Sequence, residues 1–204
     1  ITAAGGTNIV VGDNGRAEFF ANGSLRLVES IDVGDGADDE ITVTDGTNVV
    51  IGGTGNDILT LGGGTNTVLG DDGGLEVLTD ANGVATGTTV IASSNDANGG
   101  DDTIEVGPGV NIVIGGAGTD TITVLGSTPA SRATILGDSG SMTMSNSGTL
   151  LSIESSTPVS GARDVITLSS GVNTVIGGAG KDEISAGAGT NTILGDDGKA
   201  TFFD

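Results

Sequence analysis

The chain has 204 residues, 39 of them glycine, and its 27 acidic residues against 6 Lys and Arg give a formal net charge of −21. Nucleic-acid binders and proteins on anionic membranes need Lys and Arg, so this charge excludes both kinds of partner and favours cations. The sequence contains no His, Cys, Trp or Tyr, which argues against disulfides and a zinc site, and no apolar run is long enough for membrane insertion.

The chain opens with two nine-residue units, AAGGTNIVV and GDNGRAEFF, and the same period returns in three blocks. These blocks cover residues 34–78, 97–123 and 159–203. In the first block the eighth position is apolar in every unit: Ile41, Val50, Leu59, Val68 and Val77. Because residues 184–204 repeat 1–21, we expect the chain to be part of a longer array.

Three segments break the nine-residue period, at residues 21–33, 79–96 and 146–158. Each centres on a turn signal between two short runs of strand-forming residues, which predicts a β-hairpin. Asn22-Gly23 and Asn82-Gly83 are strong signals for two-residue turns, and Ser147-Gly148 is a weaker one. The expected division of the chain is 1–33 (the end of one repeat block plus a hairpin), 34–96 and 97–158 (each a block plus a hairpin) and 159–204 (a block, with the array continuing beyond).

Each nine-residue unit predicts one turn and one short strand. Six residues rich in Gly, Asp and Asn form the turn, and three residues form the strand. Because strand side chains alternate between faces, only the apolar middle residue of the three is expected to point inward. Two units make one coil, and stacked coils form two parallel sheets that face each other across a core of Ile, Val and Leu. The expected fold is therefore all-β: a parallel β-roll or β-helix (a solenoid) of nine-residue repeats, two per coil, interrupted by β-hairpins. Residues 124–136 fit as an insertion in a turn on the Asn side.

The sixth position of the units alternates between Asp and Asn, which places the two residue types on opposite edges of the solenoid. One edge carries Asp39, Asp57, Asp102, Asp120, Asp164 and Asp182, and the other carries Asn8, Asn48, Asn66, Asn111, Asn173 and Asn191. Stacked like charges destabilise the first edge, and a calcium ion, which takes roughly six to eight oxygen ligands, reverses that effect. We expect calcium at the Asp edge, and we expect each Asn to bond to its own turn and to its stacked neighbour.

Three units, GGTGNDILT, GGAGTDTIT and GGAGKDEIS, resemble the consensus of RTX (repeats-in-toxin) calcium-binding repeats. The resemblance implies a right-handed parallel β-roll with Ca²⁺ between successive turns, held by turn carbonyls and by the six sixth-position Asp side chains. It also makes the Asp residues of the closing GD turns candidate ligands: Asp13, Asp71, Asp138 and Asp196. The turn at 159–164 departs from the consensus because Arg163 enters it. Repeat blocks interrupted in this way resemble the tandem regions of giant bacterial surface and adhesin proteins of the RTX type.

The function that these observations favour is a calcium-stabilised structural or adhesive segment: a spacer, scaffold or filament unit of a large secreted or cell-surface bacterial protein. Its expected partners are neighbouring repeat blocks of the same or identical chains, with an extracellular surface or a glycan as a further candidate. The alternative is a ligand-binding solenoid that holds ice or a glycan on its Thr-Asn edge, for example through Thr47-Asn48 and Thr65-Asn66. We expect no enzyme activity, because the carboxylates repeat along exposed turns and do not converge in one cleft.

Overall fold

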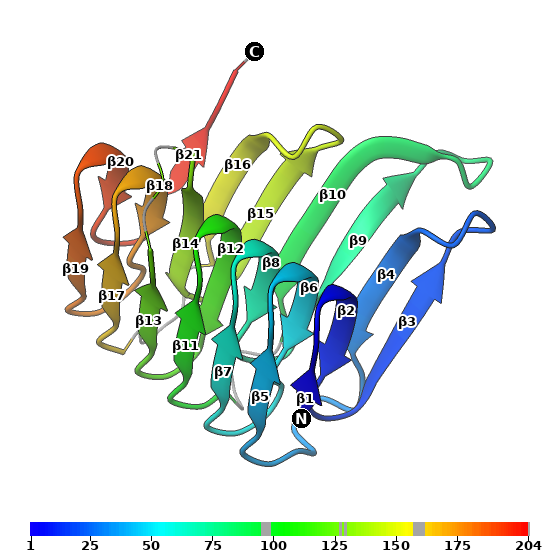
Figure 1. Cartoon of the computed structure of the whole chain (residues 1–204), viewed down its shortest axis with the longest axis horizontal. Helices are drawn as coiled ribbons and strands as arrows, with labels where there is room; N and C mark the ends of the chain where they lie inside the picture. Colours follow the sequence, from blue (N-terminus) through cyan, green and yellow to red (C-terminus); the bar gives the residue numbers. More distant parts are fainter. Residues whose placement is uncertain (95–98, 127, 129, 157–161, 204) are drawn as a thin grey trace.

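The computed structural model describes residues 1–94, 99–126, 128, 130–156 and 162–203, and every regular element in that part of the chain is a β-strand. The strands form three sheets of seven strands each. The three sheets lie in layers, which we name the outer, middle and hairpin sheets (Figure 1). No helix among the described residues has the length and apolar character needed to cross a membrane.

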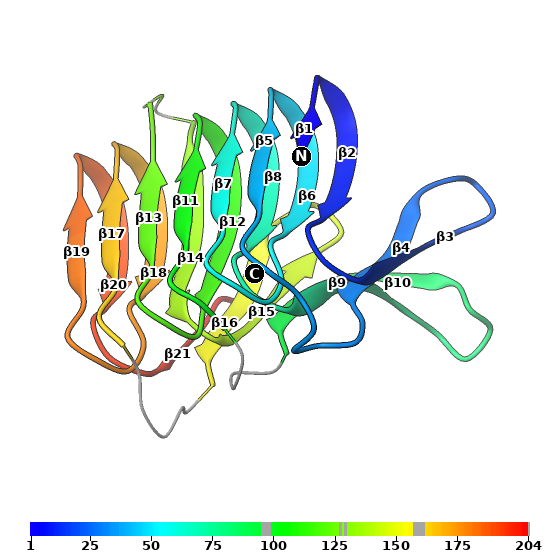
Figure 2. The same cartoon turned by 90° about the horizontal axis from the view of Figure 1, so that it is seen from below.

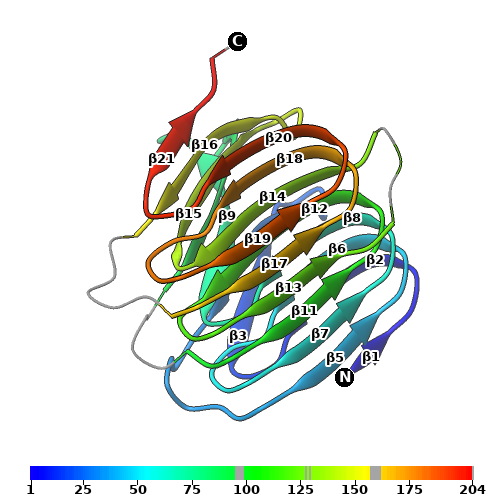
Figure 3. The same cartoon turned by 90° about the vertical axis from the view of Figure 1, so that its left-hand side faces the viewer.

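The outer and middle sheets are parallel and together form the solenoid, as the end-on view shows (Figure 3). The outer sheet contains β1 (Thr2–Ala3), β5 (Glu40–Val43), β7 (Ile58–Leu61), β11 (Thr103–Val106), β13 (Thr121–Val124), β17 (Val165–Leu168) and β19 (Glu183–Ala186). The middle sheet contains β2 (Gly6–Val11), β6 (Gly46–Ile51), β8 (Gly64–Leu69), β12 (Gly109–Gly116), β14 (Arg132–Asp138), β18 (Gly171–Ile176) and β20 (Gly189–Leu194). Each coil consists of one middle-sheet strand followed along the chain by one outer-sheet strand, which confirms the predicted all-β parallel β-roll.

The register of the coils follows the nine-residue units. Val50 pairs with Val68, and both side chains are fully buried in the core between the two parallel sheets. The long unit at 124–136 keeps this register, since Asn111 pairs with Ala133 and Ile114 with Leu136 on either side of the insertion. The insertion lies in the turn from β13 to β14, so its predicted position on the Asn side is confirmed, although residues 127 and 129 are outside the described residues.

Successive coils approach closely where each middle-sheet strand begins. Gly64 has a φ of 124°, and a β-carbon there would lie 2.1 Å from the carbonyl oxygen of Gly46 in the preceding coil. A side chain at this position would therefore separate the coils, which explains why glycine opens six of the seven middle-sheet strands, all except β14.

The hairpin sheet is antiparallel and covers the free face of the middle sheet. It contains β3 (Gly15–Phe19), β4 (Leu25–Ser30), β9 (Gly73–Thr79), β10 (Ala85–Ser93), β15 (Gly140–Ser145), β16 (Leu150–Ser155) and β21 (Lys199–Thr201). Neighbouring hairpins join edge to edge, because β4 pairs with β9, β10 with β15 and β16 with β21. The tips of β3–β4 and β9–β10 project away from the coils (Figure 2).

This third layer changes the expected burial of the middle sheet. The repeat pattern predicted that only the middle residue of each strand points inward, but Val49, Val50 and Ile51 are all buried. Val50 faces the core between the parallel sheets, whereas Val49 and Ile51 pack against the hairpin sheet in a second apolar cluster with Leu75 and Met142. The prediction was wrong for this sheet because the hairpins fold back onto it.

The predicted hairpins are present, but their turns are longer than the two-residue turns that the Asn-Gly pairs suggested. At the first tip, Gly23 N donates to Phe20 O and Phe20 N donates to Ser24 O, both at 2.9 Å. Of the two turn residues only Gly23 has a positive φ, at 85°. This is a three-residue turn with a glycine in the left-handed region at its end. Such turns are among the most common hairpin connections after two-residue turns.

Candidate functional site

The turns that run from the middle sheet to the outer sheet form one edge of the solenoid, which we call the acidic edge. Each sixth-position Asp lies at the end of such a turn, directly before an outer-sheet strand. These six residues are Asp39, Asp57, Asp102, Asp120, Asp164 and Asp182. The structure stacks them coil after coil in the predicted order, so the alternation of the sixth position correctly predicted the edge on which they lie.

In five of the six stacked Asp residues, one carboxylate oxygen accepts a backbone N–H from the preceding coil. Asp102 Oδ1 accepts the N–H of Asp57 and Asp120 Oδ1 accepts the N–H of Asp102, both at 2.8 Å. The same bond recurs from Asp39 to Asp57, from Asp120 to Asp164 and from Asp164 to Asp182, at 2.7 to 3.1 Å. These bonds hold the carboxylates inside the turns, and the sequence-based expectation of exposed carboxylates was therefore wrong. Asp57, Asp102, Asp120 and Asp164 are at most 1% exposed.

The second carboxylate oxygen has no hydrogen-bond partner. Oδ2 is buried and unpartnered in Asp57, Asp102, Asp120, Asp164 and Asp182. Each of these atoms faces a glycine carbonyl of the next coil across a small space beside the first-position glycine of the turn. At Gly52, a β-carbon would lie 2.2 Å from Asp57 Oδ2 and 2.2 Å from the carbonyl oxygen of Gly70.

This arrangement, which we call the oxygen cradle, repeats along the acidic edge. At Gly70, Gly115, Gly137 and Gly177 the corresponding two distances lie between 2.1 and 2.5 Å. Any side chain at these positions would fill the cradle, which gives the first-position glycines a specific function. The resemblance to RTX repeats implied that turn carbonyls hold Ca²⁺, but it did not single out these glycines. The signal for them is the glycine that directly follows the last apolar residue of each middle-sheet strand.

An ionised carboxylate is unfavourable in the cradle without a cation. Its free oxygen is buried and lies close to a carbonyl oxygen, so two negatively charged atoms share the same small space. Burial raises the pKa of Asp102 to about 9 and that of Asp120 to about 10, although backbone hydrogen bonds act in the opposite direction. Burial likewise raises the pKa of Asp57 and Asp164 to about 7. The metal-free cradle therefore favours the protonated acid.

The donor set of the cradle fits calcium. No three His, Cys, Asp or Glu side chains converge on one point in the described ranges, so a cage made only of side chains is absent there. Each cradle instead combines a carboxylate oxygen with a backbone carbonyl oxygen. Calcium accepts carboxylate and carbonyl oxygens at about 2.3–2.6 Å in flexible geometry, whereas magnesium requires a stricter octahedron. The sixth-position Asp residues and the glycine carbonyls of the next coil are the groups that would hold it.

The predicted GD-turn residues lie on the same edge but make different contacts. Asp71 accepts the N–H of Gly100 through Oδ1 (2.9 Å) and the N–H of Ala117 through Oδ2 (2.5 Å). Asp13 similarly accepts the N–H of Ala37 (3.2 Å) and of Thr54 (2.8 Å). The carboxylates of Asp71 and Asp13 therefore already join two segments of backbone.

The other two GD-turn residues differ in burial. Asp138 is 3% exposed, and its Oδ2 lies beside Gly178, where a β-carbon would come within 2.4 Å. Asp196 lies on the last coil and is exposed. Calcium ligation by the four GD-turn residues remains a prediction.

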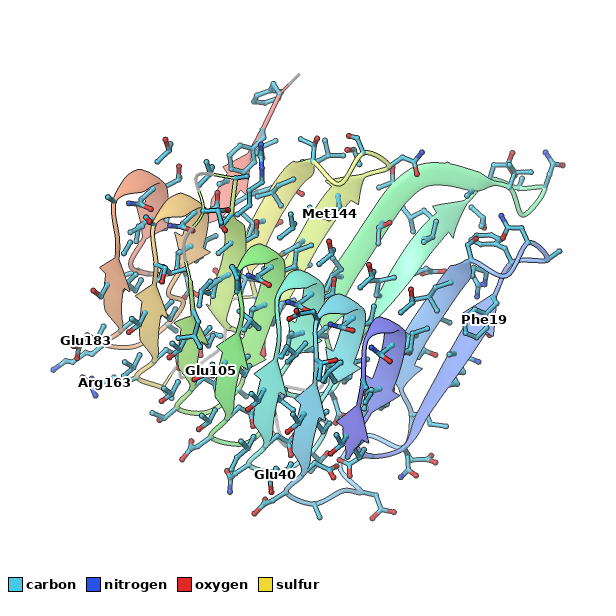
Figure 4. All side chains as sticks on the ribbon, viewed as in Figure 1. Phe19, Glu40, Glu105, Met144, Arg163 and Glu183 are labelled. Atoms are coloured by element: carbon cyan, nitrogen blue, oxygen red, sulfur yellow. The ribbon has the colours of Figure 1, made fainter. Side chains whose placement is uncertain are left out.

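Arg163 does not disturb the contacts of the neighbouring Asp164. Its guanidinium lies 2.6 Å from Glu183 at the surface (Figure 4). Asp164 is fully buried and makes the same stacked contacts as the other sixth-position residues.

The opposite edge, which we call the amide edge, shows how the sixth position behaves without a carboxylate. Asn66 Nδ2 donates to Asn111 Oδ1 (2.8 Å) and to the carbonyl oxygen of Gly62 (3.0 Å), while Asn66 Oδ1 accepts from Asn48 (2.8 Å). The predicted bonds to the own turn and to the stacked neighbour are confirmed. An amide can donate to a nearby carbonyl and a carboxylate cannot, so only the acidic edge needs a cation.

The sequence agrees with a known repeat family. A family model described as the RTX calcium-binding nonapeptide repeat (4 copies) matches residues 42–74, 96–124 and 167–201. The chain carries RTX calcium-binding repeats. RTX nonapeptide repeats bind Ca²⁺, which confirms the expected cofactor. The RTX matches include Asp57, Asp102 and Asp120, whereas Asp164 lies outside them with the same geometry. No curated protein and no solved structure matched the chain.

Proposed function

We propose that the chain is a calcium-stabilised spacer or scaffold segment of a large secreted or cell-surface bacterial protein. RTX calcium-binding repeats form a calcium-binding structural region, and RTX repeat proteins are typically secreted bacterial proteins. The observation that carries the proposal is the row of buried Asp Oδ2 atoms without a partner, each facing a glycine carbonyl. A protein placed outside the cell meets the cation that this row requires.

The proposed segment would fold when calcium becomes available. Extracellular calcium modules bind at about 10⁻⁴–10⁻³ M, which is far above the calcium concentration inside a cell. Since the cradles combine groups from successive coils, they exist only in the folded chain, and calcium binding is coupled to folding. The chain would thus remain loosely folded before export and become rigid afterwards.

We propose no catalysis by this segment. Its buried carboxylates repeat as equivalent cradles, and each is held by the backbone of a neighbouring coil. A hydrolytic site made of carboxylates requires two of them with different environments on either side of a substrate.

Nearby repeat blocks of the same or an identical chain are the proposed partners, and an adhesive or filament-forming function belongs to the same proposal. Parallel coils support it, because each coil pairs its strands with the coil on either side. Repeat arrays obtain their stability from such neighbouring units.

The alternative, a surface that binds ice or a glycan through Thr-Asn pairs, has weaker support. Asn48, Asn66 and Asn111 are at most 1% exposed and are engaged in the amide ladder, so their side chains are not presented to a ligand. Thr47 and Thr65 are exposed, but their row continues into Val110 and Arg132. An ice-recrystallisation assay and a glycan array test this alternative.

A calcium titration at pH 8, followed by far-UV circular dichroism, tests the proposal. We expect the chelated chain to gain β-structure and thermal stability between micromolar and millimolar calcium, and magnesium at equal concentration to give a much smaller effect. A chain that is fully folded in excess chelator and whose unfolding temperature is unchanged by calcium would contradict the proposal.

A further inference from the structure

The hairpins enter the solenoid at its acidic edge, in every second coil. In the coil with β6 and β7, the turn from Gly52 to Asp57 is a short uninterrupted segment. In the next coil, the chain leaves the middle sheet at Gly70, forms β9 and β10 and returns to the outer sheet only at Asp102. We call a coil without a hairpin a plain coil and a coil with one a hairpin-bearing coil. The glycine and the Asp of one cradle are five residues apart in plain coils, such as Gly52 and Asp57. They are twenty-seven or thirty-two residues apart in hairpin-bearing coils, such as Gly70 and Asp102.

The cradle is nevertheless the same in both kinds of coil. A β-carbon at Gly70 would lie 2.1 Å from Asp102 Oδ2, and one at Gly115 would lie 2.4 Å from Asp120 Oδ2. Asp102 and Asp120 are both fully buried, and both have an unpartnered Oδ2. In the hairpin-bearing coil, however, the glycine lies before the hairpin and the Asp lies after it. This cradle therefore joins the two chain segments at the base of the hairpin, which is the end that connects the hairpin to the solenoid.

The bases of the hairpins determine how the hairpin sheet sits on the solenoid. Hairpin strands contribute Leu75, Ile91, Met142 and Ile153 to the apolar cluster that covers the middle sheet. Edge-to-edge pairing of the hairpins joins all of these strands into one sheet. A shift at one hairpin base is therefore transmitted to the packing of the layer above the middle sheet.

We propose that calcium in the cradles of the hairpin-bearing coils clamps the hairpin bases and so seats the hairpin sheet on the middle sheet. This inference rests on the proposed calcium-dependent function and adds a regulated element to it. A fall in calcium opens the apolar layer between the middle sheet and the hairpin sheet before it unravels the plain coils.

Chain connectivity explains why the two kinds of coil differ. When an empty cradle expels the carboxylate of Asp120, the short turn from Gly115 still holds both ends of the segment close together. When Asp102 is expelled, the chain that connects Gly70 to Asp102 is the whole hairpin, so their separation gains more conformational freedom than in the short turn. Asp71 retains a metal-free contact across the same base, through the N–H of Gly100 at 2.9 Å. Ser94 N also donates to the carbonyl oxygen of Asp72 at 2.8 Å beside the hairpin strands. Calcium adds a further contact to these metal-free bonds.

Two matched variants test the clamp. Asp102→Ala removes a cradle carboxylate at a hairpin base. Asp182→Ala removes the equivalent carboxylate of a coil without a hairpin, where Oδ1 accepts the N–H of Asp164 rather than that of Asp102. Hydrogen–deuterium exchange with mass spectrometry, in saturating calcium, measures protection of the backbone in β9 and β10 for both variants and for the wild type. Binding of an apolar dye reports exposure of the layer between the sheets.

For Asp102→Ala we expect exchange in β9 and β10 to rise by at least tenfold and dye binding to appear. For Asp182→Ala we expect faster exchange near its own turn and unchanged protection of β9 and β10. Equal loss of hairpin protection in both variants, or full protection in Asp102→Ala, would overturn the clamp.

A measurement on the wild type covers the case in which a variant does not fold. As calcium is lowered stepwise, β9, β10 and β15 should lose protection at a higher calcium concentration than β7 and β13. Simultaneous loss in all of these strands would refute the clamp while leaving the proposed function intact. The proposed function itself fails only if calcium neither binds nor stabilises the chain.

Discussion

Replacing Asp120 by Asn should remove one calcium site and at the same time stabilise the calcium-free chain. Asp120 Oδ1 accepts the backbone N–H of Asp102 (2.8 Å), and Asn retains that acceptor. The atom that changes is Oδ2, which is buried beside the carbonyl oxygen of Gly137. An amide nitrogen there can donate to this carbonyl, as Asn66 donates to the carbonyl oxygen of Gly62 on the amide edge (3.0 Å).

The expected size of the effect follows from the proton that the calcium-free cradle retains. Burial raises the pKa of Asp120 to about 10, so at pH 7.5 the folded chain keeps this carboxyl protonated and the unfolded chain ionises it. With an unfolded pKa of about 3.9 and about 1.4 kcal/mol per pKa unit, keeping the proton costs as much as about 5 kcal/mol. Asn removes this cost, so we expect a gain of about 2–5 kcal/mol in the unfolding free energy of the chelated chain.

Urea unfolding at pH 7.5 in chelator, followed by far-UV circular dichroism, measures the gain, and calorimetric titration measures the number of calcium ions bound. If the chelated wild type is already unfolded, the variant should show a larger folded fraction. Asp80→Asn is the control, because Asp80 lies at an exposed hairpin tip, where it accepts the N–H groups of Asn82 and Val84. Unchanged calcium stoichiometry in Asp120→Asn, or lower stability in chelator, would refute the reasoning.

Three further outcomes are expected. In chelator, the wild type should lose stability as pH rises from about 4 to 10. The reason is that the raised pKa values of Asp57, Asp102 and Asp120 keep protons on the folded chain that the unfolded chain releases. Unfolding temperatures measured across this pH range with and without calcium test this, and an unfolding temperature in chelator that does not change with pH would contradict it. Gly115→Ala should lower calcium affinity in calorimetry, since its β-carbon would lie 2.1 Å from the carbonyl oxygen of Gly137, whereas Gly195→Ala, at the same repeat position with open space around it, should not. Asn66→Ala should lower the free energy of unfolding, measured in urea, by about 2–3 kcal/mol with or without calcium, because it breaks the amide ladder and leaves buried partners unpaired. A loss of stability that appears only in chelator would contradict an amide ladder that is independent of metal.

The solenoid could be predicted from the sequence because its contacts repeat with the chain. Positions such as Val50 and Val68 occupy equivalent places in successive coils, so one apolar position per unit was enough to predict the core. The alternation of Asp57 and Asn66 at the sixth position likewise predicted two chemically distinct edges.

The hairpin sheet could not be predicted in the same way. Its hairpins were recognisable from Asn22-Gly23 and Asn82-Gly83, but the pairing of β4 with β9 joins strands from different repeat blocks. Nothing in the local pattern of Leu27 or Leu75 specifies such a distant partner. The burial of Val49 and Ile51 depends on this pairing, so it was missed as well.

At the acidic edge, the sequence predicted which residues are present but not how they are used. Asp57 and Asp71 were both candidate calcium ligands. In the structure Asp57 keeps a buried Oδ2 without a partner, whereas Asp71 uses both oxygens for backbone N–H groups. The difference depends on the direction of each side chain within the stacked turns, which the residue type and the nine-residue spacing do not determine.

A crystal structure of the calcium-loaded chain, with an anomalous difference map that locates the metal ions, tests the central claim most directly. We predict peaks within about 2.3–2.6 Å of Oδ2 of Asp57, Asp102, Asp120 and Asp164, each shared with a glycine carbonyl of the next coil. Peaks bound only to surface carboxylates, or cradles that remain closed around protonated acids in millimolar calcium, would contradict the account.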